Sequence, residues 1–414
     1  MKNQLLSKNE TCRICKIQDL TKFLILGPQP LANRFLKKTQ LSELEPFYPL
    51  DVYFCHKCNL VQLVDIVDKE ELFRDYIYFS SGMPVLSEHF RLYAEDVIKK
   101  FLNSLDQFVV EIGSNDGILL KFFKDSGFKV LGIEPAENII PIAQSLGVET
   151  LNDFFSEKLA EEIVKKYGRA KVIMANNVVA HINDHHDLVK GVYKLLDDKG
   201  IFIFEAPYLI DMFENLTYDT IYHEHLSYLA ITPLSYLFRQ FGMEIFDVKL
   251  FSVQGQSIRV FVSKKGEYPV EPSVQKLIRK EKTLSLDKVE SYFYLAKRIE
   301  SSKNKLRQLL KNLKIQGKKI AAYGAPAKGN TLLNYCKIGP DILDYATDSL
   351  WSKQGLYTPG MHIPVVVPEI IQKDPPDYML LLAWNYADTI LEKEKNYRDR
   401  GGKFIFPISE IKIL

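Results

Sequence analysis

Two stretches of the chain alternate between short apolar runs and longer segments with helical spacing. In the first stretch, the apolar runs FVVEIG, KVLGIE, KVIMAN and IFIFEAP begin at positions 108, 129, 171 and 201. Strands separated by helices of about 10–15 residues predict a parallel sheet with right-handed crossovers. Two later strands, 243–251 and 257–264, are close enough in sequence to form an antiparallel pair.

The same pattern indicates the fold class. A mostly parallel sheet that ends in an antiparallel pair favours the class I methyltransferase fold, which is Rossmann-like, over a dehydrogenase. Charged, helix-favouring residues follow from 273 to about 314, and a second series of strands and helices starts at 318. That series predicts a separate, smaller doubly wound α/β domain at the C-terminus.

Cysteines and prolines distinguish the N-terminal part, which we interpret as loops and short strands around a metal. We therefore predict an α/β protein of three domains. They are a four-cysteine metal-binding lobe (1–75), a Rossmann-like domain of the methyltransferase type (76–268), and connecting helices with a smaller C-terminal Rossmann-like domain (269–414).

Composition narrows the possible classes. With 414 residues, 46% of them hydrophobic, the chain can bury several cores and is not mostly disordered. A formal net charge of +2 gives no electrostatic reason to expect a nucleic-acid partner. We see no signal peptide and no apolar run near the roughly 18 residues of a membrane span. We therefore expect a cytoplasmic protein that is a monomer.

Four of the five cysteines form two C-x-x-C pairs, Cys12 with Cys15 and Cys55 with Cys58. Two such pairs can converge on one tetrahedral zinc ion. Because cysteine would fill every position, the zinc should be structural. The alternative is four unrelated buried cysteines.

A glycine-containing turn follows the apolar strand 108–112 and includes Glu111, Gly113, Asn115 and Gly117. Glycines allow a sharp turn and a close approach to a ligand, and Glu134 ends the next strand, where a carboxylate can accept both ribose hydroxyl protons. The pattern suits an adenosine ligand. S-adenosylmethionine is favoured over NAD because the loop lacks G-x-G-x-x-G.

Histidines and acidic residues gather after the third and fourth strands. Tyr222, Glu224 and His225 lie in the run Y-H-E-H, which lacks the H-E-x-x-H spacing of a zincin but could provide acid–base groups. A polar loop with one satisfied histidine is the alternative. His181 follows the third strand, whereas His185 and His186 suggest a solvated helix start.

The first turn of the C-terminal series reads G-A-P-A-K-G-N-T from Gly324. It is not a Walker loop, but small residues, Lys328 and a helix N-terminus could hold a diphosphate. Asp348 and Lys353 follow the next strand. A helix-capping turn is the alternative.

Taken in order, the cysteine pairs, E-x-G-S-N-D-G, Y-H-E-H-L-S-Y and G-A-x-A-K-G-N-T make the chain resemble the zinc-containing sugar C-methyltransferases of deoxysugar biosynthesis. The resemblance covers nearly the whole chain. It implies S-adenosylmethionine as methyl donor and a nucleotide-linked 4-keto-6-deoxy sugar as acceptor, methylated at C-3. The nucleotide would be dTDP, with GDP or CDP as alternatives.

The resemblance also assigns residues to each site. The zinc ligands would be the four paired cysteines. The donor site would contain Gly113, Asn115, Glu134 and Asn177; the sugar would be surrounded by Tyr76, His181, Tyr222, Glu224 and His225; the diphosphate would be held by Ala327, Lys328, Gly329, Asn330, Asp348 and Lys353.

A C-3 hydrogen beside a ketone is acidic, so we expect His225 to act as the base that forms an enolate. Glu224 would orient it, and Tyr222 and His181 would stabilise the enolate or position the sugar.

One departure from the family is Gln254-Gly-Gln256-Ser257 in place of H-G-G-S, which predicts different sugar substituents if this loop touches the sugar. The alternatives are an O- or N-methyltransferase, a zinc-ribbon nucleic-acid protein and an inactive binding module.

Overall fold

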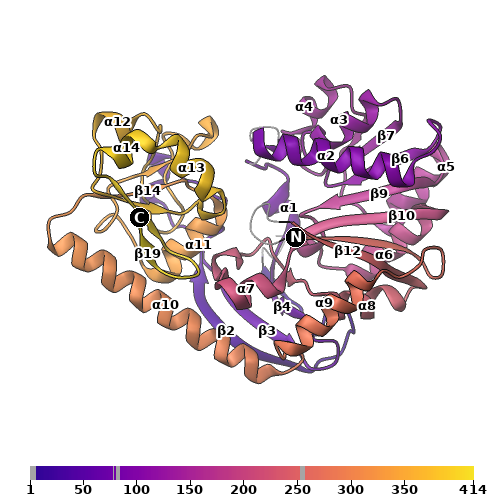
Figure 1. Ribbon diagram of the computed structural model, residues 1–414, viewed down its shortest axis with the longest axis horizontal. Coiled ribbons are helices and arrows are strands. Elements are labelled where there is room, and N and C mark those ends of the chain that lie inside the picture. The colour runs from indigo at the N-terminus through magenta and orange to yellow at the C-terminus, as the bar shows by residue number, and fades with distance from the viewer. Residues whose placement is uncertain (1–5, 78, 81–83, 252–256) are drawn as a thin grey trace. The chain divides into compact units, whose positions relative to one another are not determined.

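The structure is a computed structural model and describes residues 6–77, 79–80, 84–251 and 257–414 (Figure 1). The chain forms two compact units, each assembled from segments that are distant in sequence. Unit 1 comprises Met1–Thr21, Phe54–Leu209 and Leu226–Lys288, and unit 2 comprises Lys22–Tyr53, Ile210–His225 and Val289–Leu414. The three-domain division drawn from the sequence stays a prediction.

A seven-stranded sheet forms the centre of unit 1, in the order β12-β13-β10-β9-β6-β7-β8. The pairs among β10, β9, β6, β7 and β8 are parallel, whereas β13 pairs antiparallel with both β10 and β12. The predicted parallel sheet with an antiparallel end is thus confirmed. The strands are β6 (Phe108–Ile112), β7 (Lys129–Ile133), β8 (Thr150–Leu151), β9 (Ala170–Asn176), β10 (Leu196–Pro207), β12 (Met243–Phe251) and β13 (Ser257–Lys264).

Helices cover both faces of this sheet, which explains why central strands such as β6 are buried at every position. Helices α2, α3 and α4 lie on one face, and α6 and α8 on the other (Figure 1). Phe90, Tyr93 and Val97 of α2 are buried in the core. The helices of unit 1 are α1 (Lys69–Phe73), α2 (Pro84–Phe101), α3 (Ile118–Asp125), α4 (Ile140–Ser145), α5 (Glu157–Tyr167), α6 (His185–Leu195), α8 (Ile231–Arg239) and α9 (Pro272–Thr283).

Short strands make up the rest of unit 1. Strand β1 (Leu6–Lys8) pairs with β5 (Asp65–Val67), and β4 (Val61–Leu63) pairs with β11 (Ser227–Tyr228). The short helix η3 (Val179–His181) follows β9 directly.

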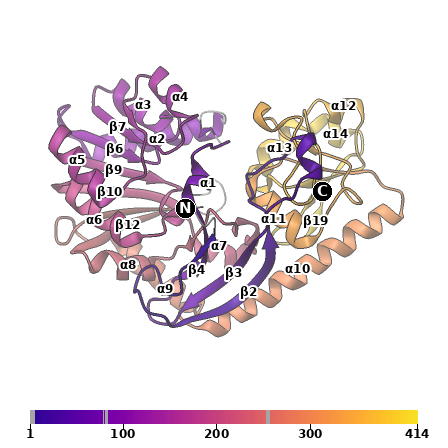
Figure 2. The ribbon, with the colours of Figure 1, turned by 180° about the vertical axis from the view of Figure 1, so that it is seen from behind.

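Unit 2 contains a six-stranded sheet in the order β16-β15-β14-β17-β18-β19, parallel except for the last pair. This confirms the predicted C-terminal α/β domain. The long helix α10 (Val289–Ile315) packs against α11 (Ala327–Cys336) (Figure 2). The remaining elements of the domain are β14 (Ile320–Tyr323), β15 (Ala346–Thr347), η5 (Trp351–Lys353), β16 (Val365–Val366), α12 (Ile370–Lys373), β17 (Tyr378–Leu381), η6 (Trp384–Tyr386), α13 (Ala387–Lys393), α14 (Lys395–Asp399), β18 (Lys403–Phe406) and β19 (Lys412–Ile413).

Two neighbouring strands, β2 (Leu20–Gln29) and β3 (Tyr48–Cys55), lie in the segment between the cysteine pairs. At ten residues, β2 is longer than the short strands predicted there. Unit 2 also contains η1 (Lys38–Ser42), η4 (Tyr218–Thr220) and most of α7 (Leu209–Asn215).

Two further predictions from the sequence concern the loop at 254–256 and membrane-spanning segments. Gln254, Gly255 and Gln256, the departure from the family pattern, lie outside the described residues. Among the residues described, no helix combines the length and the apolar character that a bilayer crossing requires.

Candidate active site and zinc site

The four predicted zinc ligands converge on one point in unit 1. The Sγ atoms of Cys12 and Cys58 are 3.4 Å apart, as are those of Cys15 and Cys55, and all four lie within 4.8 Å of one another. Four sulfurs about 2.3 Å from one tetrahedral zinc ion would be about 3.8 Å apart, so the donor set and its spacing fit zinc. With cysteine at every position, the chemistry of the site is structural.

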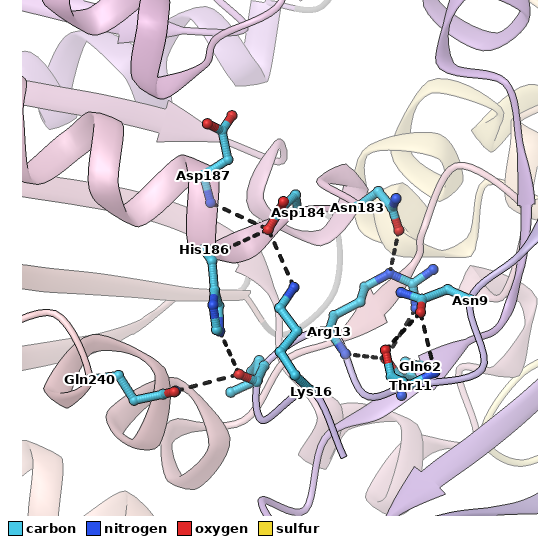
Figure 3. A network of polar contacts seen from close by, with 11 residues as sticks. Asn9, Thr11, Arg13, Lys16, Gln62, Asn183, Asp184, His186, Asp187 and Gln240 are labelled. Carbon is cyan, nitrogen blue, oxygen red and sulfur yellow. Dashed lines mark hydrogen bonds and ion pairs between the residues drawn. The ribbon is translucent and has the colours of Figure 1, made fainter. Parts of the chain in front are cut away.

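Arg13 links the segment 12–16, which we call the zinc knuckle, to the rest of unit 1. Its buried guanidinium donates to Asn183 Oδ1 at 3.1 Å, to Gln62 Oε1 at 3.1 Å and to the Leu63 carbonyl (Figure 3). A buried arginine needs such acceptors because its charge has left water. The knuckle is therefore fixed to the loop that follows η3.

The same loop begins helix α6, and the knuckle covers it (Figure 3). His186 donates from Nε2 to the Ile14 carbonyl at 2.6 Å, and Lys16 approaches Asp184 at 3.4 Å. His185 is fully buried, and burial lowers its pKa to about 3. The predicted helix start is confirmed, since α6 begins at His185, but it is not solvated there, because the zinc knuckle packs against this helix end.

The predicted donor loop follows β6 and contains residues in left-handed backbone conformations. Gly113 has φ +64°, and a Cβ there would lie 2.4 Å from Cγ2 of Val178, so only glycine fits this close approach. Gly117, Asn115 and Asn177 also have positive φ, at 76°, 48° and 56°. The ends of β6 and β9 thus meet in two tight turns.

Glu134, directly after β7, faces this loop. Its Oε2 accepts from the Asn115 backbone N–H at 2.8 Å, and its Oε1 accepts from Ala136 N–H at 2.9 Å. Burial raises the pKa of Glu134, while these two N–H groups oppose the rise. Each oxygen keeps a second lone pair, so the carboxylate can still accept ribose hydroxyl protons.

Glu111 lies beneath the loop and is buried. Its Oε1 accepts from Asn176 Nδ2 at 3.0 Å, and its Oε2 is buried with no hydrogen-bond partner in the part of the chain that the structure describes. Burial raises the pKa of Glu111 to about 8, and the nearby Asp116 carboxylate adds to the rise. A neutral carboxyl group with one unused oxygen fits a site completed by a polar ligand.

Tyr76 and His181 come together in unit 1 through a residue that the sequence did not single out. Phe73 stacks on the His181 ring at 5.5 Å between centroids and lies 5.9 Å from the Tyr76 ring. Asn138, four residues after Glu134, binds the Tyr76 backbone N–H and carbonyl at 3.1 and 2.9 Å. The segment with Tyr76 is thereby attached beside the predicted donor residues.

In unit 2, His225 has a defined tautomer. Its Nδ1 donates to the Thr220 carbonyl at 2.7 Å, and because a carbonyl can only accept, Nε2 is the basic nitrogen. Burial lowers the pKa of His225 to about 4, whereas the Thr220 carbonyl acts to raise it. The Tyr222 ring packs on this imidazole at 4.0 Å between centroids. The two predicted side chains are therefore in contact.

His223, between them, has a structural role. Its Nε2 lies 3.3 and 3.2 Å from the carbonyls of Tyr48 and Pro49, and burial lowers its pKa to about 4. It anchors the 222–225 loop to β3. One histidine of Y-H-E-H is thus a buried structural residue bonded through Nε2, although its Nδ1 has no hydrogen-bond partner among the described residues.

Glu224 is buried and held by Asn33, whose Nδ2 donates to Oε1 at 2.7 Å. No sequence motif indicated Asn33, which is 191 positions away. Asn33 is therefore a positioning residue for Glu224.

The predicted diphosphate turn lies at the start of α11. Gly324 has φ +83°, and a Cβ there would be 2.8 Å from the Ala383 Cβ. Asp348 accepts from the Ala325 N–H at 2.9 Å, and Lys353 donates to the Ala325 carbonyl at 2.9 Å. Asp348 and Lys353 thus hold the turn from both sides.

The first turn of α11 contains Ala327, Lys328, Gly329 and Asn330. Lys328 donates to Asn385 Oδ1 at 2.6 Å, and burial lowers its pKa to about 8. Asn330 is buried and donates to the Ala32 carbonyl at 2.7 Å, so its amide hydrogen holds the neighbouring loop. Lysine and helix N–H groups remain suited to an anion.

Three family models match consecutive parts of the chain. They are described as a zinc binding domain (residues 12–73), a methyltransferase domain (residues 86–248) and a C-methyltransferase C-terminal domain (residues 252–409). The chain is also 35% identical over 406 residues to the C-methyltransferase NovU of Streptomyces niveus, covering 98% of this chain and 97% of that protein. This chain belongs to the C-methyltransferase family. The predicted family is confirmed.

Solved structures of other methyltransferases match part of this C-methyltransferase. Magnesium protoporphyrin IX methyltransferase of Synechocystis PCC 6803 is 13% identical with a TM-score of 0.33, covering 44% of this chain and 82% of that chain. A methyltransferase of Archaeoglobus fulgidus is 15% identical with a TM-score of 0.35, covering 43% and 94%.

The enzyme is thus an S-adenosylmethionine-dependent C-methyltransferase with a structural zinc site. This outcome favours S-adenosylmethionine over NAD. The zinc is assigned to Cys12, Cys15, Cys55 and Cys58, whereas the donor-site assignments of Glu111, Gly113, Asn115, Gly117, Glu134 and Asn177 stay predictions.

Glu134→Ala should weaken binding of S-adenosylmethionine at least about tenfold, because a charge-assisted hydrogen-bond pair to the ribose is lost. Isothermal titration calorimetry on the zinc-loaded enzyme measures this, with S-adenosylhomocysteine as a second ligand. Glu137→Ala is the matched control, since Glu137 belongs to the same loop and its backbone N–H donates to the Arg74 carbonyl, so the substitution leaves this contact in place. Equal donor affinity in both variants would refute the assignment.

Proposed function

We propose that this C-methyltransferase methylates C-3 of a nucleotide-linked 4-keto-6-deoxy sugar after His225 removes the C-3 proton. The hydrogen bond from His225 Nδ1 to the Thr220 carbonyl carries the proposal. It presents Nε2 as the base and stabilises the imidazolium that forms when Nε2 takes the proton. The adjacent ketone makes this proton acidic, because the enolate places its charge on oxygen.

The other acid–base residues have supporting roles. Tyr222, in ring contact with His225, is the candidate donor to the enolate oxygen. Glu224, which accepts a hydrogen bond from Asn33, would orient the histidine or the sugar. His181 and Tyr76, joined through Phe73, would position the sugar.

The donor residues support the methyl-transfer half of the reaction. S-adenosylmethionine supplies an electrophilic methyl group to the nucleophilic carbon. Gly113 and Asn177 shape the two turns at the ends of β6 and β9, Asn115 fixes the Glu134 carboxylate, and Glu134 would bind the ribose.

The turn before α11 supports a nucleotide-linked acceptor. Lys328 and the N–H groups of the first turn of α11 offer positive charge to a diphosphate, and Asp348 and Lys353 shape the turn. We propose dTDP as the nucleotide, with GDP and CDP as the alternatives to test.

The product distinguishes this reaction from O- or N-methylation. Enzyme, S-adenosylmethionine and a dTDP-linked 4-keto-6-deoxy sugar should give a C-methyl singlet in the proton NMR spectrum. In D2O, with S-adenosylhomocysteine in place of the donor, deuterium should enter C-3. A methoxy signal without exchange at C-3 would show an O-methyltransferase and refute the proposal. GDP- and CDP-sugars, run in parallel, identify the nucleotide.

A further inference from the structure

A buried carboxylate in unit 2 has no place in the reaction described so far. Asp219 is 1% exposed, and its Oδ2 accepts from Trp384 Nε1 at 2.7 Å. The Trp384 ring in turn lies under the Lys328 ammonium, which is 3.8 Å from the ring centroid. Asp219, Trp384 and Lys328 therefore form one cluster at the first turn of α11.

The charges of the cluster compensate one another. Burial raises the pKa of Asp219 to about 6, and attraction to Lys328 and the hydrogen bond from Trp384 oppose that rise. Asp219 is thus mainly ionised at neutral pH. Its Oδ1 is buried and accepts no hydrogen bond from any described residue, so the Trp384 contact is what holds this carboxylate.

The backbone continues directly from this carboxylate to the base. Asp219 is the middle residue of η4, and the next residue, Thr220, supplies the carbonyl that accepts from His225 Nδ1 at 2.7 Å. The Thr220 hydroxyl bonds back to the Thr217 carbonyl at 2.7 Å, which makes the turn compact. Two hydrogen bonds and one peptide unit therefore separate Trp384 from the His225 imidazole.

We propose that Asp219 is a positioning residue that fixes His225 by anchoring η4 to Trp384. Asp219 also connects, through Trp384, to Lys328 in the nucleotide-binding turn. Part of the binding energy of the nucleotide, which does not itself react, therefore helps to orient His225. Remote binding energy of this kind raises kcat when it is used for orientation at the reacting centre. This inference rests on the proposed function.

Three variants of the zinc-loaded full-length enzyme test the link. Asp219→Ala removes the acceptor, Trp384→Phe removes the donor but keeps a ring under Lys328, and Asp219→Asn retains an acceptor oxygen. We expect kcat to fall by about tenfold to 10²-fold in the first two, with little change in the KM for the sugar nucleotide, and to recover in Asp219→Asn. The double variant should lose no more than either single variant, because both remove one hydrogen bond.

Two comparison variants separate positioning from binding and from general damage. Lys328→Ala should raise the KM and lower kcat by less than Asp219→Ala does, because the hydrogen bond from Trp384 to Asp219 remains. Glu394→Ala removes a carboxylate that accepts from Tyr323 at 2.9 Å in the same domain, away from η4, and should behave as wild type. Wild-type kcat in Asp219→Ala, or a loss confined to KM, would overturn the inference.

A spectroscopic measurement makes the test independent of the substrate. In enzyme labelled with 15N-histidine, the Nδ1–H proton of His225, assigned by its absence in His225→Asn, should be shifted downfield by its hydrogen bond. Asp219→Ala and Trp384→Phe should broaden or move this signal, and Asp219→Asn should restore it. An unchanged signal in all three refutes the positioning role, whereas a wild-type enzyme that is inert on every 4-keto sugar nucleotide refutes only the proposed function.

Discussion

Replacing His225 by asparagine is expected to lower kcat by about 10²–10⁴-fold, the usual contribution of a general base. Asparagine can still donate to the Thr220 carbonyl, so the loop should keep its shape while the basic nitrogen is lost. Methyl transfer and exchange of the C-3 proton in D2O should disappear together, because both need deprotonation. Steady-state kinetics and proton NMR measure the two losses.

The neighbouring histidine offers the matched control. His223→Asn alters a buried histidine of the same motif that faces the carbonyls of Tyr48 and Pro49. It should reduce the melting temperature but leave kcat within a few-fold of wild type. If His223→Asn loses as much kcat as His225→Asn, the loop rather than the base explains both losses. Full activity in His225→Asn would remove the histidine from the mechanism and make Glu224 the next candidate.

The dependence of kcat on pH should also report the protonation state of His225. Protonation removes the base, so kcat falls as pH drops through the pKa of His225. Burial lowers that pKa to about 4, which moves the acid limb to lower pH than the ordinary value near 6.5. We therefore expect no loss of kcat from His225 between pH 8 and pH 6. A limb centred near pH 6.5 would contradict a buried, neutral imidazole.

Local patterns predicted the fold well. The strand and helix periods from 108 to 264 predicted six of the seven strands and the antiparallel end of the sheet, but not the two-residue strand β8. The sharp turn at Gly113 was predicted from its place after a strand. The structure shows why glycine is needed there, since a Cβ atom would collide with Val178. The four cysteines were sufficient for the zinc site.

Such local patterns could not predict contacts between segments that are distant in sequence. Asn33 is an ordinary polar residue in its own loop and gains a role only because Glu224 folds against it. Asp219 stands three residues before Tyr222, yet its meaning depends on Trp384, 165 positions away. His185 and His186 were misjudged for the same reason, since the zinc knuckle that covers them is about 170 residues earlier.

Loss of the zinc ion should have the largest effect on stability. Structural zinc contributes about 10–16 kcal/mol of apparent binding free energy in small zinc peptides, more than most domains have as net stability. We expect one zinc per chain by elemental analysis, and a Cys55→Ser enzyme that is poorly soluble or melts at a much lower temperature. Cys336→Ser is the control, because this fifth cysteine is buried in unit 2 and should leave the zinc content at one.

The effect of zinc should extend to the donor site, although no cysteine lies in it. The knuckle binds Asn183 through Arg13 and His186 through the Ile14 carbonyl, and these residues directly follow the helix η3 that ends at His181. A chelator that removes zinc should therefore weaken binding of S-adenosylmethionine as well as lower the melting temperature. Arg13→Ala keeps all four ligands and should retain zinc while still weakening the donor, which separates the tether from the metal. If zinc-free, folded enzyme binds S-adenosylmethionine with native affinity, the zinc knuckle stabilises only its own segment. The contacts of Arg13 and His186 would then have no effect on binding of the methyl donor.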